Sequence, residues 1–355
     1  MRRCLVGLLS AVVVLALPAV AAAKTKVVYA GGPAAFQNQI GNKYGGEVTS
    51  FMRQRITINV GDSVVWNGKS LANGFHTVDI PKLHGSDLPL IMPSGGNVPS
   101  TVLDAAGNPF WFDGKLPNLG LDPTLFAPSG GVKYNGSARV DSGLPLGPPK
   151  DFKVKFTKAG TYEYFCDVHP GMHGWVIVLA KGKHVPSAKD DAKALKASEK
   201  HYVAEVKALD KTKVTGANVQ LGAAKPDGAE ILAFFPATLQ VKAGTTVTFM
   251  IAKHSAETHT ASFGPADYLQ AQANIFFSPT TGAVDPIAAF PSDPPGSITL
   301  TPTSHGNGFA NVGALDQDAS TKTIPASGKI DFTTPGTYHY ICLIHPFMHG
   351  TVIVK

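Results

Sequence analysis

The chain has 355 residues, which is enough for two domains of ordinary size. It contains 37 glycines and 27 prolines, and charged residues make up only 16% of it, a composition that favours many short strands joined by turns over long helices or disorder. The net charge of +6 falls to +4 (29 basic against 25 acidic residues) if a leader with Arg2 and Arg3 is removed, and so modest a charge gives no reason to expect nucleic-acid binding.

Residues 1–23 have the pattern of a secretory signal peptide. Arg2 and Arg3 form a positive start, residues 5–20 form an apolar core, and three alanines at 21–23 offer small residues for cleavage before Lys24. A transmembrane anchor is the alternative, but the apolar run is barely long enough to span a bilayer. We therefore expect a protein exported to the periplasm or the cell exterior, with no membrane span after the leader is cleaved.

Residues 24–182 predict a domain of short strands with one large interruption. Residues 81–149 are rich in Gly, Pro, Ser and Asn, and a segment of this length in a compact domain should have local structure of its own. The predicted strands are bounded by turn residues and cover residues 26–29, 55–60, 63–66, 77–80, 152–156 and 162–165.

Residues 183–217 differ in kind from the rest and predict a helical linker. The segment 187–213 is rich in Ala, Lys, Asp and Glu and lacks Gly and Pro, and Ser187 with Asp190 resembles a capping arrangement. Apolar residues recur there at helical spacing, at Leu195, Tyr202, Val206 and Leu209. We expect about six helical turns with one apolar face.

Residues 218–355 repeat the first half. Strands are predicted at 238–241, 245–250, 338–341 and 351–354, and from residue 336 onward each position matches one 176 residues earlier. A second large insertion, residues 265–325, occupies the same place as the first. The sequence therefore predicts an all-β fold made of two related domains, residues 24–182 and 218–355.

Each half contains a short loop between two strands with a thiol, an imidazole and a thioether at three-residue steps. The loops hold Cys166, His169 and Met172 in the first half, and Cys342, His345 and Met348 in the second. Because the two cysteines occupy equivalent positions in separate domains, we do not expect a disulfide between them, and a metal is the simplest reason for an exported protein to keep two unpaired thiols.

A distant histidine completes each set. His76 and His259 each begin or precede a predicted strand and are followed by a threonine. Two imidazoles and one thiolate in a plane, with a weak axial thioether, form the ligand set of an electron-transfer copper centre. A structural zinc site is disfavoured because each set has only one thiolate and includes a methionine.

The motif Cys-x-x-His-Pro-x-Met resembles the ligand loop of the blue copper proteins, or cupredoxins, and its short spacing is most similar to that of the amicyanin type. The resemblance implies a Greek-key β-sandwich in each half, and an exposed ring edge at His169 and His345 for a redox partner. Thr77 and Thr260 stand where many cupredoxins have an asparagine that helps tie two ligand loops together. The resemblance implies two type 1 copper sites, formed by His76, Cys166, His169 and Met172 and by His259, Cys342, His345 and Met348.

These features predict an electron carrier and not an enzyme, with donor and acceptor proteins that the sequence does not identify. A multicopper oxidase or nitrite reductase is the alternative, but no His-x-His pair occurs in the chain and no histidine adjoins Cys166 or Cys342. Copper storage or delivery could use the same ligands. His173 and His349 follow the methionines in both halves; we expect hydrogen-bonding surface groups there, with auxiliary metal ligands as the alternative.

Overall fold

The computed structural model describes residues 23–81, 90–125, 128–278, 280–294, 296–317 and 324–355, so the predicted leader lies almost entirely outside the described residues. The fold is mainly β, with several sheets and some helices, rather than all-β as predicted. Within the described ranges, no helix combines the length and the apolar character needed to cross a membrane.

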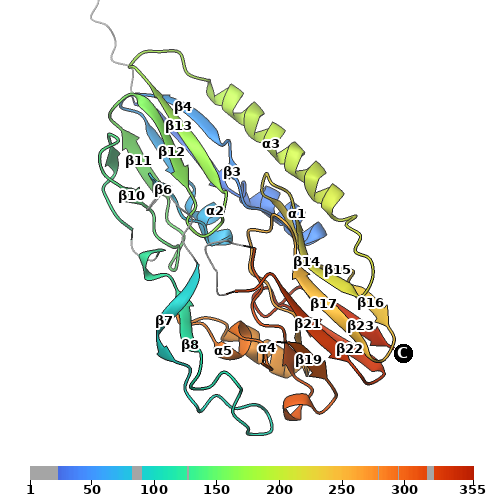
Figure 1. Ribbon diagram of the computed structural model, residues 1–355. Coiled ribbons are helices and arrows are strands. Elements are labelled where there is room, and N and C mark those ends of the chain that lie inside the picture. Colours follow the sequence, from blue (N-terminus) through green and yellow to red (C-terminus); the bar gives the residue numbers. More distant parts are fainter. Residues whose placement is uncertain (1–22, 82–89, 126–127, 279, 295, 318–323) are drawn as a thin grey trace, which may run out of the picture.

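The first half forms two five-stranded sheets that enclose one core (Figure 1). Along its strands buried and exposed residues alternate, so that each sheet turns one apolar face inward. The largest buried side chains between the sheets include Trp66, Tyr164 and Phe156. In sheet order, the strands are β3 (Phe51–Met52), β1 (Thr25–Ala30), β5 (Ser63–Trp66), β11 (Phe152–Phe156) and β9 (Lys133–Tyr134), and then β10 (Val140–Asp141), β6 (Asp79–Ile80), β12 (Gly160–Phe165), β13 (His173–Leu179) and β4 (Arg55–Asn59).

The second half repeats this arrangement with six and five strands around a second core. Phe249, Phe263 and Tyr340 lie in this core, and their rings contact one another. In sheet order, the strands are β19 (Ser297–Leu300), β21 (Ser327–Phe332), β17 (Thr245–Ile251), β14 (Asn218–Ala224), β15 (Ala229–Phe235) and β2 (Gly46–Val48), and then β16 (Thr238–Val241), β23 (His349–Val354), β22 (Gly336–Ile341), β18 (Ser262–Phe263) and β20 (Ala310–Asn311).

Strand β2 belongs to the first half of the sequence but pairs with β15 of the second half. The pairing is antiparallel and sets Glu47 opposite Glu230. The chain enters β2 from helix α1 (Ala34–Tyr44), which the glycine-rich sequence did not predict. Gly45 ends this helix in the left-handed region, at φ 62°, and hydrogen-bonds back to Gly41.

Helix α3 (Ala188–Leu209) confirms the predicted helix, and Ser187 and Asp190 form the predicted capping box. It lies along both halves of the molecule (Figure 1). Its buried residues Tyr202, Val206 and Leu209 form a third core with α1 and β15. At the other end of the helix, Asp191 contacts Lys26 and Arg53 of the first half, at 3.0 and 2.8 Å. The helix therefore packs on both halves.

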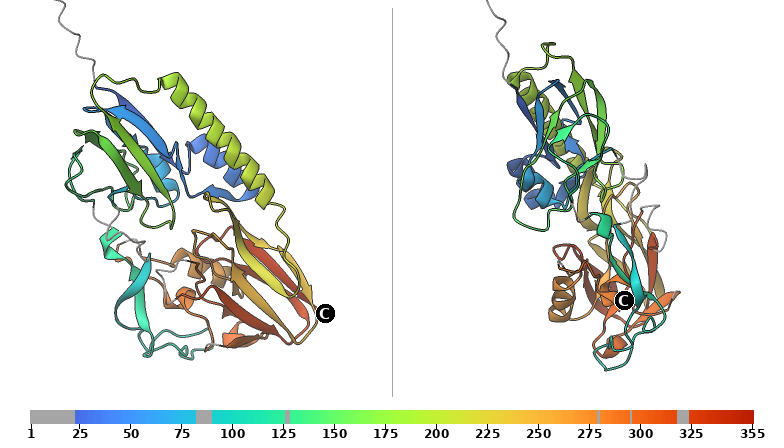
Figure 2. Two further views of the ribbon diagram at one scale, coloured as in Figure 1. Left: turned by 45° about the horizontal axis from the view of Figure 1, so that its top comes forward. Right: turned by 90° about the vertical axis from the view of Figure 1, so that its left-hand side faces the viewer.

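The two insertions pack against each other and form a fourth core. The hairpin β7 (Ile91–Asn97) and β8 (Pro117–Leu121) lies beside α5 (Pro286–Ala289) of the second insertion, and α5 contacts α4 (Ala266–Asn274) (Figure 2). Two backbone hydrogen bonds, from Leu121 to Gly282 and from Val284 to Leu119, join the two insertions. The remaining helical turns are α2 (Gly68–Asn73), η2 (Pro123–Leu125) and η3 (Ser304–Gly306).

We expect Ile40→Ala to lower the free energy of unfolding by about 2–5 kcal/mol, because Ile40 of α1 is fully buried in the core that joins the two halves. Gln39→Ala, an exposed change on the same helix, should alter it by about 0.5 kcal/mol or less. Urea denaturation of the two variants checks this. Equal stabilities would contradict the packing of α1 between the halves.

Candidate metal centres

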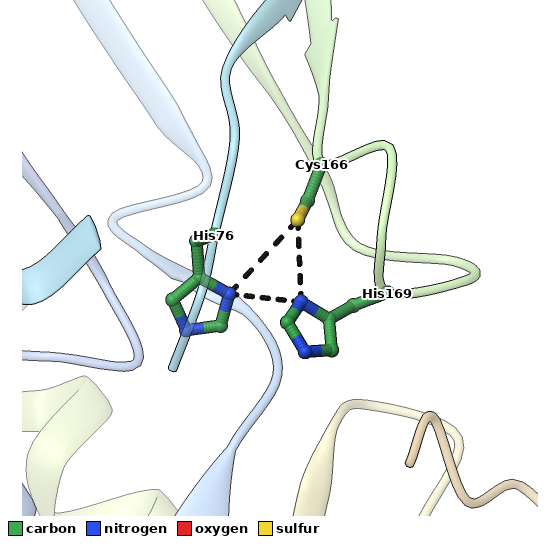
Figure 3. A group of neighbouring side chains, drawn as sticks. All are labelled: His76, Cys166 and His169. Atoms are coloured by element: carbon green, nitrogen blue, oxygen red, sulfur yellow. Dashed lines mark hydrogen bonds between the residues drawn. The ribbon is translucent and has the colours of Figure 1, made fainter. Parts of the chain in front are cut away.

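The first cluster brings together His76, Cys166 and His169, as predicted (Figure 3). His76 precedes β6, Cys166 follows β12, and His169 lies in the loop between β12 and β13. The two Nδ1 atoms are 3.0 Å apart, and Cys166 Sγ lies 3.2 Å from His169 Nδ1 and 3.9 Å from His76 Nδ1. All three side chains are buried.

The second cluster has the same construction from His259, Cys342 and His345. The Nδ1 atoms of the two histidines are 3.1 Å apart, and Cys342 Sγ lies 3.9 Å from His259 Nδ1 and 3.8 Å from His345 Nδ1. Both cysteines are free, as the expectation of no disulfide required.

The donor atoms of each cluster fit a bound cation. Two imidazole nitrogens that face each other at about 3 Å repel unless one proton or one positive ion lies between them. The adjacent sulfur adds a soft donor, and a set of two imidazoles and one thiolate suits copper in both of its oxidation states. The residues present therefore fit copper.

Met172 and Met348 are buried in the same loops. In the first loop Cys166 N–H donates to Met172 O, and Met172 N–H donates to His169 O, at 2.9 and 3.0 Å. The second loop has the equivalent pair of bonds, at 3.2 and 2.8 Å. These bonds hold the loops closed, and the role of the two methionines as axial ligands stays a prediction.

Thr77 and Thr260 tie the ligand loops together where many cupredoxins have asparagine. The backbone N–H of each donates to the cysteine sulfur of its own site, at 3.4 and 3.3 Å. Each hydroxyl accepts the N–H of the residue after that cysteine, Asp167 or Leu343, at 2.8 Å in both sites. The threonine hydroxyl therefore supplies the link between the loops in both halves.

The outer faces of His169 and His345 turn toward the junction between the halves, where the His345 side chain is 16% exposed. His169 is only 5% exposed, so the predicted exposed ring edge is wrong for this residue. Both rings line a cavity of about 730 Å³ between the two halves, together with Glu47, Glu257 and Phe347. The cavity forms because the β2–β15 pairing and the contact between the insertions bring the two ligand loops together.

Glu257 lies between these two rings. Its Oε1 is 3.0 Å from His169 Nε2, and its Oε2 is 3.6 Å from His345 Nε2. Burial acts to raise the pKa of Glu257, but the hydrogen bond and charge of His169 lower it to about 2. The carboxylate is therefore ionised at neutral pH.

Glu47 and Glu230, the partners across β2 and β15, accompany the other two histidines. Glu230 Oε1 lies 4.0 Å from His259 Nε2. A Cβ on Gly74 would lie 2.6 Å from His76 Nε2 and 2.7 Å from Glu47 Oε1, so these two atoms flank that glycine. Burial and the charge of Glu257 raise the pKa of Glu47 to about 7 and that of Glu230 to about 8.

The surroundings of the second site favour Cys342 as a thiolate and His345 as an imidazolium. Although burial acts to raise it, hydrogen bonds from His259 and His345 hold the pKa of Cys342 well below its usual value. Burial acts to lower the pKa of His345, but the Cys342 thiolate and nearby carboxylates raise it to about 9. A metal ion at this site would replace the proton of His345.

Reasoning from the sequence missed the three glutamates. Glu257 lies two residues before His259, but the equivalent residue in the first half is Gly74, so the repeat gives no signal for it. Glu47 lies in a glycine-rich stretch without a motif. Only the pairing of the two halves shows where these carboxylates lie.

His173 and His349 lie outside the clusters. His173 is half-buried and contacts Glu163 at 3.4 Å, and His349 is exposed. Their position favours the predicted surface role over that of auxiliary ligands.

No family model and no curated protein matches this chain. Among solved structures it is similar to oxidised plastocyanin from Dryopteris crassirhizoma (23% identity, 39% of this chain, 99% of that chain, TM-score 0.22). It is also similar to a purple cupredoxin from Nitrosopumilus maritimus (17% identity, 39% and 100%, TM-score 0.21) and to a point mutant of amicyanin in its Cu(I) form (19% identity, 41% and 87%, TM-score 0.21).

The metal chemistry follows from the ligand residues of this chain. The chain has two pairs of sheets, each with a cluster of two histidines and a cysteine and with a methionine in the same loop. This set of residues is consistent with type 1 copper at both sites.

Thr260→Val should lower the free energy of unfolding by about 1–3 kcal/mol, because the buried N–H of Leu343 loses its acceptor. Thr260→Ser retains the hydroxyl and should stay close to the unchanged protein. Chemical denaturation of the metal-free variants distinguishes them. If serine were as destabilising as valine, the hydroxyl would not be the tie between the loops.

The affinity of the second site for copper should rise with pH up to about 9 and then level off, because the proton of His345 competes with the metal below its raised pKa. One displaced proton corresponds to a change of about tenfold per pH unit. Titration of the Cys166→Ser protein against a copper-binding competitor at several pH values measures this. An affinity that stayed flat between pH 6 and 8 would contradict it.

Proposed function

We propose that this protein is an exported electron carrier with two type 1 copper centres, formed by the residues predicted from the sequence. The observation that carries the proposal is that two imidazole Nδ1 atoms and one cysteine sulfur converge in each half of the molecule. In each half an equivalent hydrogen bond to a threonine hydroxyl holds the ligand loops in place. Copper bound there would supply one-electron chemistry between Cu(I) and Cu(II).

The chain's own residues favour electron transfer through a rigid site. The cysteine sulfur of each site accepts a backbone N–H from the neighbouring threonine. Buried apolar side chains pack around the cysteine and methionine of each loop. A site that is held in place by packing and hydrogen bonds changes little when the charge of the metal changes, which favours fast electron transfer.

The enzyme alternative has less support. Oxidases and reductases built from such domains need a further copper, commonly bound by His-x-His pairs and a histidine beside the cysteine. Phe165 and Asp167 flank Cys166 in this chain, and Ile341 and Leu343 flank Cys342. Carboxylates, not additional histidines, lie beside the ligand histidines at the junction between the halves.

The purified protein should bind two coppers per chain and show the intense absorption of thiolate-to-copper charge transfer. Cys166→Ser and Cys342→Ser should each remove one centre, and the double variant should be colourless, because each thiolate is the source of its own absorption. Metal analysis, visible absorption and electron paramagnetic resonance check this.

Two results would overturn the proposal in different ways. Colour that survived in the double variant would show that the ligand assignment is wrong. A third copper with a type 2 resonance signal would favour the enzyme alternative. Secretion is tested separately, by sequencing the N-terminus of the exported protein, which should begin at Lys24.

A further inference from the structure

The outer nitrogens of two ligand histidines, one from each metal site, meet a single carboxylate. His169 and His345 both turn Nδ1 toward their own cluster and Nε2 toward Glu257. The two contacts use different oxygens of that carboxylate, at 3.0 and 3.6 Å, so they can exist at the same time.

A histidine that binds a metal through Nδ1 carries its proton on Nε2 and donates it to an outer acceptor. An ionised carboxylate has only acceptors, and each of its oxygens can take one such N–H. Glu257 Oε1 lies within hydrogen-bond distance of His169 Nε2, at 3.0 Å, and Oε2 makes an ion-pair contact with His345 Nε2, at 3.6 Å. The carboxylate therefore offers one acceptor oxygen to each ring, whereas an amide would turn its NH2 group toward one of them.

The arrangement occurs once, although the domain occurs twice. Gly74 stands at the position that corresponds to Glu257, two residues before the first histidine of its site. A Cβ there would lie 2.6 Å from His76 Nε2, so a second carboxylate at that position would collide with the ring. Glu257, from the second half, therefore has no counterpart at the equivalent position of the first half.

Glu230, a further carboxylate near the second site, differs in this respect. Glu230 lies near His259 alone, at 4.0 Å from Nε2. It therefore offers a natural comparison, because it contacts a ligand of one site whereas Glu257 contacts a ligand of each.

We propose that Glu257 is a shared positioning residue that couples the two metal sites, and that His169, Glu257 and His345 form the path by which an electron passes between them. The proposal rests on the proposed function, since it requires copper at both sites. With copper held by both sets of ligands, one electron would leave the reduced site and enter the oxidised one, so that one centre would be oxidised as the other is reduced and no further reactant would be consumed. The chain is then one coupled pair of centres, and not two independent carriers.

The first test measures copper affinity one site at a time, with Cys342→Ser or Cys166→Ser used to silence the other site. Glu257→Ala should weaken binding at both sites by about tenfold or more, the usual effect of losing an outer hydrogen-bond partner. Glu230→Gln should affect only the second site. Glu257→Gln keeps the volume of the side chain but has one acceptor oxygen, so it should weaken one site more than the other.

The second test follows the ring signals of the histidines by NMR. In the Cys342→Ser protein, Cu(I) added to the first site should shift the Nε2–H signal of His345, and Glu257→Ala should abolish that shift. A second sample contains copper at both sites, with one copper reduced and the other oxidised in each chain. Electron exchange between the two sites should be slower in the Glu257→Ala variant than in the unchanged protein.

The outcomes separate the two proposals. If the unchanged protein bound fewer than two coppers, the proposed function would fail. If it bound two, but Glu257→Ala altered one site or neither, or left the His345 shift and the exchange rate unchanged, the coupling would fail alone. Should the alanine variant not fold, Glu257→Gln decides by the same measurements, because a variant that left the copper affinity of both sites unchanged would contradict the shared carboxylate.

Discussion

The pairing of β2 with β15 is the interaction on which the rest of the structure depends. Three residues from the first half of the chain, Gly46–Val48, complete a sheet of the second half. A strand edge that is paired in this way leaves fewer backbone groups exposed and fixes the register between the halves. Helix α1, helix α3 and the two insertions then add apolar cores around this junction.

The junction changes what the two ligand loops contact. In a separate domain the outer edge of a ligand histidine would face solvent and a partner protein. Here His169 and His345 face a cavity between the two halves, which Phe347, a residue 59% exposed, also lines. The partner that each histidine meets first is therefore the other half of the same chain.

Electrostatics at the junction follow from the same geometry. Three carboxylates, Glu47, Glu230 and Glu257, lie near the ligand histidines of the two clusters. Burial raises the pKa of Glu47 and Glu230, whereas the contact with His169 lowers that of Glu257. The pKa of Glu257 is lowered because its oxygen lies only 3.0 Å from an imidazole nitrogen, whereas Glu230 is 4.0 Å from the nearest ligand nitrogen and burial dominates its pKa.

The sequence by itself determined the repeat, most strands, the capped helix and the residues of both clusters, because these depend on local spacing: period-two alternation, turn residues, and ligands three residues apart. It did not determine α1, β2 or the role of Glu257. The glycine-rich segment before Glu47 has no strong periodicity, and Glu257 has no counterpart in the first half. Which faces of the two domains meet depends on contacts between residues far apart in the chain, such as Glu47 with Glu230 and Leu121 with Gly282, and only the tertiary structure decided that the two metal sites share one carboxylate.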